Sequence, residues 1–348
     1  MQTDNLSNLR QLGRTPLHLS TLGFGGAPLG NLFTAVDESD AVAALDAAWE
    51  LGVRYFDTAP LYGLGLSEVR LGRALAHRPR AQFCLSTKVG RLLDISTQGA
   101  HGGLYVDTPS VQPRFDYSYD GCLRSIEASL RRLCLDRIDI VFIHDVDSWT
   151  HGAEQVEPRF LEAMNGAYRA LEHLRKSAVI GAIGVGVNEW QICERFLEAG
   201  DFDVFLLAGR YTLLEQEAVR TFLPACKERG AAVVIGGPYN TGILATGATP
   251  DARYNYHPAD DSIKHRVRHL EDICAAHRVS LPAAALQFPL FHPSVTSVIP
   301  GGRNAREVRS NAAFMTESIP PAFWQELKTR GLLDRAAPID LPRLAHAR

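Results

Sequence analysis

Four side chains that can donate, accept or orient a proton lie at or just after the ends of apolar runs in the sequence. Asp57 ends the run in RYFDTAPLYG and Tyr62 follows in the next loop, while Lys88 ends FCLSTK and His144 ends IDIVFIH. An ionised carboxylate at the edge of a core is costly unless a cation pairs with it, and Lys88 supplies that cation. An ammonium held near a phenol favours the phenolate and lowers its pKa from about 10. With His144 to orient an oxygen, the set suits proton transfer at a carbon–oxygen centre.

The same residues allow other interpretations. Asp57 and Lys88 by themselves would be an ion pair that seals the edge of a core, and one such pair does not decide between structure and catalysis. Lys88 at a strand end could also be the nucleophile of a Schiff-base aldolase, which needs neither a cofactor nor Tyr62. A metal-dependent hydrolase is a further alternative, because HDVDSWTH (144–151) offers carboxylates and imidazoles. The chain contains no H-x-H motif, and we predict no metal site.

The repetition of the sequence predicts the scaffold that must hold these residues. Eight short apolar runs alternate with segments that carry apolar residues at helical spacing. Strands that are apolar on both faces and alternate with helices form a parallel sheet, and eight such units predict closure into a (β/α)8 TIM barrel. A doubly wound sheet is the architectural alternative. The expected strands are 21–26, 53–57, 83–88, 138–144, 179–187, 204–209, 232–237 and 295–301, and the expected helices are 38–51, 67–76, 117–133, 157–176, 189–199, 215–228, 261–277 and 304–313.

Three segments do not fit this repeat. QLGRTPLHLS (11–20) alternates and turns at a glycine, which predicts an N-terminal β-hairpin that closes the bottom of the barrel. Residues 92–115 form a long irregular loop after the third strand, and residues 245–261 form another after the seventh. Because both loops leave from the carboxyl ends of strands, where barrel active sites are built, we expect them to cover the substrate. Phe24, Tyr239 and the 92–115 loop are the expected substrate contacts.

The composition indicates a soluble globular chain without an electrostatic reason to bind nucleic acid or membrane. Of its 348 residues, 46% are hydrophobic and 22% are charged, and the formal net charge is -3. No run approaches the roughly 18 apolar residues of a membrane span, and the N-terminus does not read as a targeting signal, so we expect a cytoplasmic protein. No Pro-, Gly- or Ser-rich linker divides the chain. We predict a single domain over residues 1–348, with a core at 9–335 and a loose tail at 336–348.

Five longer stretches match one protein family in the same order. They are RQLGRTPLHLSTLGFGG, FDTAPLYGLGLSEVRLGRAL, LSTKVGR, SIEASLRRLCLDRIDIVFIHD and IPGGRNAREVRSN. Through them nearly the whole chain resembles the aldo-keto reductases. The resemblance implies an oxidoreductase in which Tyr62 is the general acid and base. It further implies that Lys88 and Asp57 tune Tyr62 and that His144 orients the substrate oxygen.

Other stretches resemble one branch of that family. LGFGGAPLGNLF, RFDYSYDGCLRSIEASL, LLAGRYTLLEQ and AALQFPLFHP are similar to bacterial dehydrogenases that act at C1 of aldoses such as L-fucose, with pyridoxal 4-dehydrogenases as near relatives. The resemblance implies oxidation of a cyclic hemiacetal to a lactone, with a sugar as substrate or, alternatively, pyridoxal. Tyr62 would then take the hydroxyl proton, which predicts an alkaline activity optimum. A non-catalytic sensor that binds the dinucleotide is the third possibility. The sequence does not indicate an oligomeric state.

The resemblance also implies a nicotinamide dinucleotide, although the chain has no G-x-G-x-x-G motif. That absence counts against a Rossmann domain and fits a barrel that binds the dinucleotide across its rim. The family match assigns the carboxamide contact to Asn188, preceded by Gly186, and the ring that stacks on the nicotinamide to Tyr211. Ala208 stands where many members carry a glutamine that holds the carboxamide, so nicotinamide contacts here are expected to differ in detail.

The segment IPGGRNAREVRSN is expected to hold the adenosine end. Gly301 and Gly302 let a backbone approach a phosphate, and the helix start that follows offers N–H donors. Many relatives that prefer NADP have a lysine and an arginine where this chain has Gly301 and Glu307, so we predict NAD as the preferred cofactor. NADP stays possible if Arg303 clamps its phosphate. The predicted cofactor contacts are Gly186, Asn188, Tyr211, Pro238, Gly301, Gly302, Arg303, Glu307 and Asn311.

Overall fold

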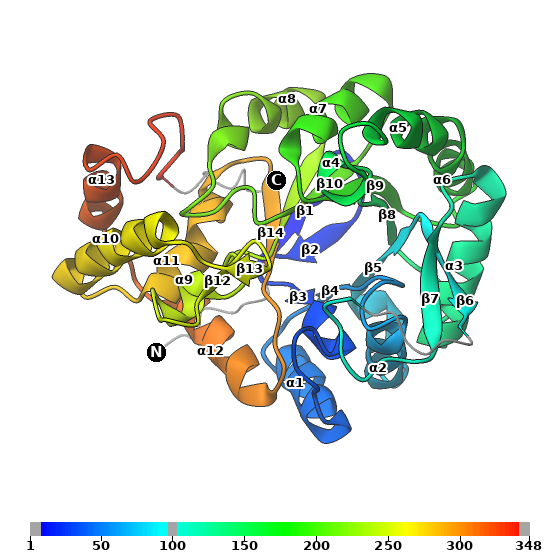
Figure 1. Ribbon diagram of the computed structural model, residues 1–348, viewed down its shortest axis with the longest axis horizontal. Helices are drawn as coiled ribbons and strands as arrows, with labels where there is room; N and C mark the ends of the chain where they lie inside the picture. Colours follow the sequence, from blue (N-terminus) through cyan, green and yellow to red (C-terminus); the bar gives the residue numbers. More distant parts are fainter. Residues whose placement is uncertain (1–7, 97–102, 341–348) are drawn as a thin grey trace.

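The computed structural model describes residues 8–96 and 103–340, and its central feature is a closed barrel of eight parallel strands (Figure 1). The first and last strands are joined by the isolated bridges Leu22–Val298 and Gly25–Gly301, which close the sheet. An open doubly wound sheet would leave these two strands as edges, so the predicted TIM barrel is confirmed. The barrel strands are β3 (Phe24–Gly25), β4 (Tyr55–Asp57), β5 (Cys84–Val89), β8 (Ile140–His144), β9 (Ala182–Val187), β10 (Val204–Ala208), β11 (Ala232–Gly236) and β14 (Val295–Ile299).

Each barrel strand is apolar on both faces because it separates two cores. Along β8, Ile140 and Phe142 belong to the cluster inside the barrel, whereas Val141 and Ile143 belong to the larger cluster shared with the surrounding helices. Successive side chains of a strand point to opposite faces, so a continuous apolar run fills both clusters. This is why the strands were readable from the sequence without polar alternation.

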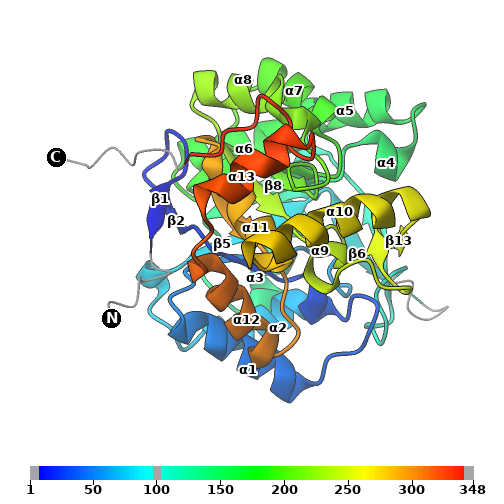
Figure 2. The same ribbon diagram turned by 90° about the vertical axis from the view of Figure 1, so that its left-hand side faces the viewer.

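The N-terminal hairpin closes one end of the barrel, as predicted. It consists of β1 (Leu9–Gln11) and β2 (His18–Ser20), and Leu12 and Leu19 are fully buried in the cluster inside the barrel. Figure 2 shows this hairpin at one side of the molecule and β6 and β13 at the opposite side. The two ends of the barrel therefore have different roles, and the loops after the strands gather at the end that the hairpin leaves open.

The helices surround the barrel in the order that the sequence predicts (Figure 1). The longer helices are α1 (Glu38–Glu50), α2 (Leu66–Leu75), α3 (Tyr119–Leu133), α5 (Val156–Asn165), α6 (Ala167–Lys176), α7 (Trp190–Ala199), α8 (Phe222–Arg229), α10 (Asp261–His277), α12 (Ala305–Thr316) and α13 (Pro321–Thr329). The shorter ones are α4 (Ser148–His151), α9 (Ile243–Thr246) and α11 (Leu281–Gln287), together with the 3-10 turns η1 (Ala27–Gly30), η2 (Arg80–Gln82), η3 (Glu217–Val219) and η4 (Phe288–Phe291).

The predicted single helix over 157–176 is wrong, because the chain breaks at Gly166 into α5 and α6. A Cβ at Gly166 would lie 2.4 Å from the carbonyl oxygen of Tyr117, so the backbone of the preceding barrel unit occupies the space that a side chain would need. Helical periodicity continues across the break, which is why the pattern alone did not reveal it. In the same way, the predicted helix 215–228 begins as η3 and continues as α8.

The 92–115 segment is more regular than predicted. Its ends form an antiparallel pair, β6 (Arg91–Ile95) with β7 (Val111–Phe115), so the expected irregular loop is corrected to a hairpin arm. Residues 97–102, which belong to the same prediction, lie outside the described residues. The segment after the seventh barrel strand contains α9 and a short pair, β12 (Arg253–Tyr254) with β13 (His257–Pro258).

The predicted loose tail begins too early. Ala337 is fully buried in the outer core and Ile339 packs against it, so the chain stays attached beyond residue 335. Residues 341–348 of the predicted tail lie outside the described residues. Among residues 8–96 and 103–340, no helix has the length and apolar character needed to cross a membrane.

Candidate active site

The structure brings Asp57 and Lys88 together as a buried ion pair at the open end of the barrel. Asp57 ends β4, and its Oδ2 lies 2.7 Å from Nζ of Lys88 on the neighbouring strand β5. Ser86 donates a hydrogen bond of 2.6 Å to the other carboxylate oxygen, and Nζ also donates to the carbonyl of Thr58 at 2.8 Å. Both side chains are almost fully buried. Every polar atom that this pair buries therefore has a partner, which is the condition under which such a pair is tolerated.

Tyr62 lies above this pair, in the loop that follows β4. Nζ of Lys88 is 4.7 Å from the centroid of the Tyr62 ring, and the ring meets the His144 imidazole edge-on with centroids 6.0 Å apart. The predicted catalytic residues Tyr62, Asp57, Lys88 and His144 are thus neighbours in space. Burial, reinforced by the negative charge of Asp57, raises the pKa of Tyr62 well above its usual value. The lowered pKa that the sequence predicts for Tyr62 is therefore not the net result in this structure, because burial disfavours the charged phenolate.

His144 is held as a neutral imidazole. Burial lowers its pKa well below the usual value, and the positive charges of Arg91 and Lys88 lower it further. The backbone carbonyl of His144 accepts a hydrogen bond of 2.8 Å from the buried Tyr117 hydroxyl, which fixes the end of β8. A neutral imidazole beside Tyr62 can orient an oxygen without competing for its proton.

Asn188 follows β9, and contacts with neighbouring strand ends fix its position. Its backbone N–H donates to Oδ2 of Asp147 at 2.8 Å, and its side-chain amide donates to Oδ1 of Asp145 at 3.4 Å. Gly186, two residues earlier, lies beside Lys88, since a Cβ there would be 3.5 Å from Cε of the lysine. The predicted carboxamide contact therefore stands next to the predicted catalytic residues.

A cavity of about 750 Å³ begins at Tyr62 and extends to the start of α12. That volume lies in the range of small-molecule and cofactor sites. Glycines line much of it, and a Cβ at Gly301 would lie 2.4 Å from Cγ of Pro28, so this rim needs a residue without a side chain. A cavity of this size with a glycine-rich backbone rim fits a dinucleotide. The predicted residues that line it are Asp57, Tyr62, Pro238, Tyr239, Gly301, Arg303 and Glu307.

At the far end of the cavity, Arg303 and Glu307 pair with each other. Nη2 of Arg303 lies 2.6 Å from Oε1 of Glu307, whose other oxygen accepts from the Arg303 backbone N–H at 2.9 Å. The Asn304 side chain caps α12 by accepting from the N–H of Glu307. The guanidinium that the sequence offered as a phosphate clamp is therefore already bound to a carboxylate.

Asn311 joins two walls of the cavity. Its side-chain amide donates to the Gly301 carbonyl at 3.2 Å, and its oxygen accepts from the Tyr239 hydroxyl at 2.7 Å. Tyr239 therefore lines the cavity but directs its hydroxyl toward α12. Gly302 lies against Val308, because a Cβ there would be 2.7 Å from a methyl group of that residue.

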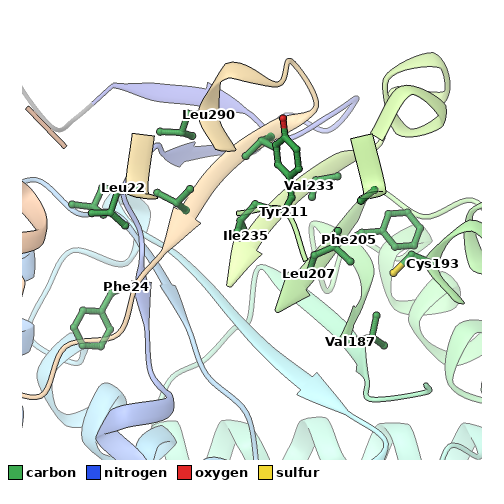
Figure 3. Close-up of a cluster of buried hydrophobic side chains, with 14 of the residues drawn as sticks. Leu22, Phe24, Val187, Cys193, Phe205, Leu207, Tyr211, Val233, Ile235 and Leu290 are labelled. Atoms are coloured by element: carbon green, nitrogen blue, oxygen red, sulfur yellow. The ribbon is translucent and has the colours of Figure 1, made fainter. Parts of the chain in front are cut away.

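Two predicted contacts are buried in the hydrophobic core. Figure 3 shows Tyr211 within a cluster of buried hydrophobic side chains, and it has no exposed surface. The centroid of its ring lies 5.0 Å from that of Phe288 and 6.0 Å from that of His292. The Tyr211 ring therefore presents no open face to the cavity in this structure, and its stacking on the nicotinamide stays a prediction. Phe24 is only 3% exposed, packs on Phe56 and is not among the residues that line the cavity, so its substrate contact stays a prediction.

The cavity also has aromatic residues near its wall that the sequence did not rank. The Tyr105 ring lies 6.2 Å from that of Tyr62, and Tyr105 forms a β-bridge with Leu32. Tyr256 lines the cavity from the β12–β13 turn, and Arg253 of the same segment lies over the Phe33 ring. Both tyrosines come from the two loops predicted to cover the substrate. In the sequence, only their aromatic residue type could have identified them as substrate contacts. Their distance from Tyr62 depends on the tertiary structure.

The metal-site alternative finds no support in the described part of the chain. There, no group of three or more His, Cys, Asp and Glu side chains is arranged to hold a metal ion. Asp147, which the sequence offered as a ligand, instead caps α4 by accepting from the N–H of Thr150 at 2.9 Å. His151 accepts or donates in a 3.0 Å contact with the Tyr117 hydroxyl.

Comparison with known proteins identifies the class to which this fold and site belong. The sequence profile of the Aldo/keto reductase family matches residues 21–329, and the chain belongs to that family. It is similar to an aldo-keto reductase of Bacillus halodurans solved in its holo form, with a TM-score of 0.70 and 25% identity, covering 97% of this chain and 98% of that one. The family uses nicotinamide dinucleotides, and the protein is accordingly an oxidoreductase.

Two relatives narrow the comparison further. The chain is 41% identical over 342 residues to the pyridoxal 4-dehydrogenase of Microbacterium luteolum, covering 94% of this chain and 98% of that protein. It is 40% identical over 323 residues to the D-threo-aldose 1-dehydrogenase of a Pseudomonas species, covering 91% of this chain and 95% of that protein. Both relatives are named as dehydrogenases of small molecules.

Proposed function

We propose that the protein oxidises the C1 hemiacetal hydroxyl of an aldose to a lactone, with NAD as the hydride acceptor. The observation that carries this proposal is Tyr62 at the wall of the cavity, above a lysine that Asp57 holds in place. The 40% identity to a D-threo-aldose 1-dehydrogenase supports the choice of substrate class.

In this proposal each polar residue has one task. Tyr62 accepts the proton of the C1 hydroxyl, and the Lys88 ammonium beneath its ring stabilises the phenolate. Neutral His144 hydrogen-bonds the same substrate oxygen and holds it toward Tyr62. Asn188 contacts the carboxamide of the dinucleotide, whose nicotinamide ring supplies the hydride acceptor when bound. The substrate loses two electrons and one proton as a hydride from C1, which the dinucleotide would accept, and a second proton from the hydroxyl, which Tyr62 accepts.

Because the pKa of Tyr62 is raised, oxidation and reduction should depend differently on pH. A protonated phenol is ready to donate to a carbonyl, whereas oxidation requires it to lose its proton first. Below the pKa of the phenol, the phenolate fraction increases about tenfold for each pH unit. We therefore expect alkaline conditions to favour oxidation.

The preference for NAD rests on the charges at the start of α12. Glu307 is an anion within the lining of the cavity and already neutralises Arg303. A 2′-phosphate approaching Arg303 would meet the Glu307 carboxylate, which already pairs with that guanidinium. The adenosine ribose of NAD has hydroxyls in place of this phosphate, and the Glu307 carboxylate can accept hydrogen bonds from them.

Oxidation of pyridoxal to 4-pyridoxolactone is the second candidate, favoured by the 41% identity to a pyridoxal 4-dehydrogenase. It uses the same step, because pyridoxal also forms an internal hemiacetal. The two candidates differ in the shape of the ring that must fit beside Tyr62: a flat aromatic ring in one case and a puckered polyol in the other.

The test is the appearance of reduced nicotinamide absorbance when purified protein is mixed with NAD or NADP and each substrate separately. The substrates are L-fucose, D-arabinose, L-galactose, D-glucose and pyridoxal. Turnover of an aldose with NAD is the expected result. Turnover of pyridoxal alone would replace the substrate while keeping the mechanism, and failure with every substrate would reject both.

The cofactor preference has its own test in Glu307→Gln. Removing this anion should raise the ratio of kcat/KM with NADP to that with NAD by roughly tenfold, because Arg303 becomes free to meet a phosphate. Glu50→Gln is the matched control, since Glu50 also pairs with an arginine, Arg309 at 3.4 Å, but does not line the cavity. An unchanged ratio in Glu307→Gln would contradict the role given to this carboxylate.

A further inference from the structure

The residue after His144 is a buried aspartate in an uncommon backbone conformation. Asp145 has a φ of 53°, in the left-handed region that residues other than glycine seldom adopt. Its N–H donates to the carbonyl of Gly186 on β9 at 2.9 Å, so the neighbouring strand holds it in this conformation. Backbone strain of this kind persists only where the surroundings impose it, and it concentrates at functional sites.

The Asp145 carboxylate lies between two of the residues assigned to the reaction. Its Oδ2 is 3.4 Å from Nε2 of His144, and its Oδ1 accepts from the side-chain amide of Asn188 at 3.4 Å. The carboxylate is therefore shared by the imidazole assigned to the substrate oxygen and the amide assigned to the nicotinamide carboxamide. These two side chains come from different strands, β8 and β9.

Arg91 holds the carboxylate from the opposite side. Its Nη2 is 2.8 Å from Oδ2 of Asp145, both side chains are at least 90% buried, and the guanidinium stacks 4.6 Å from the centroid of the Phe115 ring. Its Nη1 is buried without a hydrogen-bond partner among the described residues. Across those same residues, Asp145 is the one acidic side chain paired with Arg91.

We propose that Asp145, held by Arg91, is a positioning residue that fixes His144 and Asn188 relative to each other. It does not touch substrate; it aligns the group that orients the reacting oxygen with the group that orients the hydride acceptor. This inference rests on the roles proposed above for His144 and Asn188. Hydride transfer needs the two reacting carbons at close and defined separation, and a misplacement of about 1 Å can cost about a hundredfold in rate.

The charge of Arg91 is needed to keep Asp145 in this role. Burial raises the pKa of Asp145 to about 6, Asp147 adds to that rise, and Arg91 and Lys88 oppose it. Without the guanidinium, the pKa of this carboxyl would rise further, because the main charge that lowers it would be gone. A protonated carboxyl attracts the Asn188 amide and the imidazole less strongly, so both side chains would gain freedom.

The experiment compares Asp145→Asn with Asp139→Asn. Asp139 precedes the same strand, β8, and forms the same kind of pair with an arginine, Arg80 at 2.6 Å, at the opposite end of the barrel. Asp145→Asn should lower kcat by ten- to a hundredfold with a smaller change in KM for substrate, and should weaken NADH binding measured by fluorescence. Asp139→Asn should leave kcat within twofold. Equal effects of the two substitutions on kcat would overturn the proposal.

Arg91 variants keep the test decisive if Asp145→Asn does not fold. Arg91→Lys retains a cation and should recover at least half of wild-type kcat, whereas Arg91→Gln should resemble Asp145→Asn. Melting curves select folded variants for this comparison. Equal activity of Arg91→Lys and Arg91→Gln would show that the charge on Asp145 is not being held by this residue, and would reject the proposal.

A double-mutant cycle separates positioning from general loss of stability. If Asp145 acts through Asn188, the loss of NADH affinity in Asp145→Asn should shrink to less than twofold when Asn188 is already Ala. Additive losses would reject the coupling. The cycle requires only NADH binding, so it remains informative if wild-type protein oxidises none of the substrates, which is the outcome that would reject the proposed function instead.

Discussion

The two ends of the neighbouring strands β5 and β8 carry the same kind of ion pair with different partners. At the N-terminal end, Asp139 pairs with Arg80 and also accepts from the backbone N–H of Leu85 at 2.8 Å. At the C-terminal end, the Asp145 carboxylate pairs with Arg91, but its other contacts are to the side chains of His144 and Asn188. One carboxylate attaches strand to strand; the other holds functional side chains.

The two ends of the barrel also differ in how they are filled. At the N-terminal end, Leu12 and Leu19 fill the barrel with apolar side chains. At the C-terminal end, a cavity of about 750 Å³ begins beside Asp57 and Tyr62. The apolar side chains at the N-terminal end stabilise the barrel. We expect the buried charges at the C-terminal end to affect catalysis more than stability. The following predictions test this division.

The largest effect is expected for Tyr62→Phe. Removing the hydroxyl takes away the proton acceptor, so kcat/KM should fall by about a thousandfold. NADH affinity should change by less than twofold, because the ring remains. Steady-state absorbance assays and fluorescence titration measure the two quantities. Tyr119→Phe is the control, since the Tyr119 hydroxyl contacts His173 far along the chain at 2.7 Å; a Tyr62→Phe variant as active as this control would remove Tyr62 from the mechanism.

Lys88→Met should affect both activity and stability. It leaves the Asp57 carboxylate buried without its cation, which should lower the free energy of unfolding by about 3–5 kcal/mol, and kcat should fall by about a hundredfold. The double variant with Asp57→Asn removes both charges and should recover most of the stability without recovering kcat. Urea denaturation and turnover assays distinguish these effects. Recovery of activity in the double variant would mean that the pair is structural only.

The pH dependence should differ between the two reaction directions. Because burial and Asp57 raise the pKa of Tyr62, the phenol stays protonated at neutral pH. Oxidation, which needs the phenolate, should accelerate by up to tenfold per unit from about pH 7 to pH 9, while the reverse reduction stays nearly constant. Initial rates in both directions measure this. Parallel profiles would contradict proton transfer through Tyr62.

The smallest effect on turnover is expected for Asp139→Asn at the N-terminal end. Losing the charge that pairs with Arg80 should lower the free energy of unfolding by about 2–3 kcal/mol, although the asparagine oxygen can still accept from the Leu85 N–H. The kcat of the folded protein should stay within twofold of wild type, because no contact of Asp139 reaches the cavity residues. A tenfold loss of kcat would show that the two ends are coupled and that the comparison fails.

Several residues show how far the sequence reached. The sequence places Asp57, Lys88 and His144 at strand ends and Tyr62 in the loop after Asp57, and the structure brings the four together. Asp145 was visible in the sequence, but only as a possible metal ligand, because nothing local links it to Arg91, which directly precedes the 92–115 segment. Tyr105 and Tyr256 lie in the loops expected to cover the site, but the sequence did not predict that these residues lie near Tyr62.

The sequence by itself determined the barrel, because apolar runs, helical spacing and turn residues are local properties that repeat eight times along the chain. It also determined which polar residues stand at strand ends. Only the tertiary structure decided which side chains are buried: Tyr211 is covered by Phe288 and His292 from a distant part of the chain, and Phe24 by Phe56. It likewise decided that the Tyr62 phenol is held protonated, because desolvation depends on the surrounding atoms rather than on residue type.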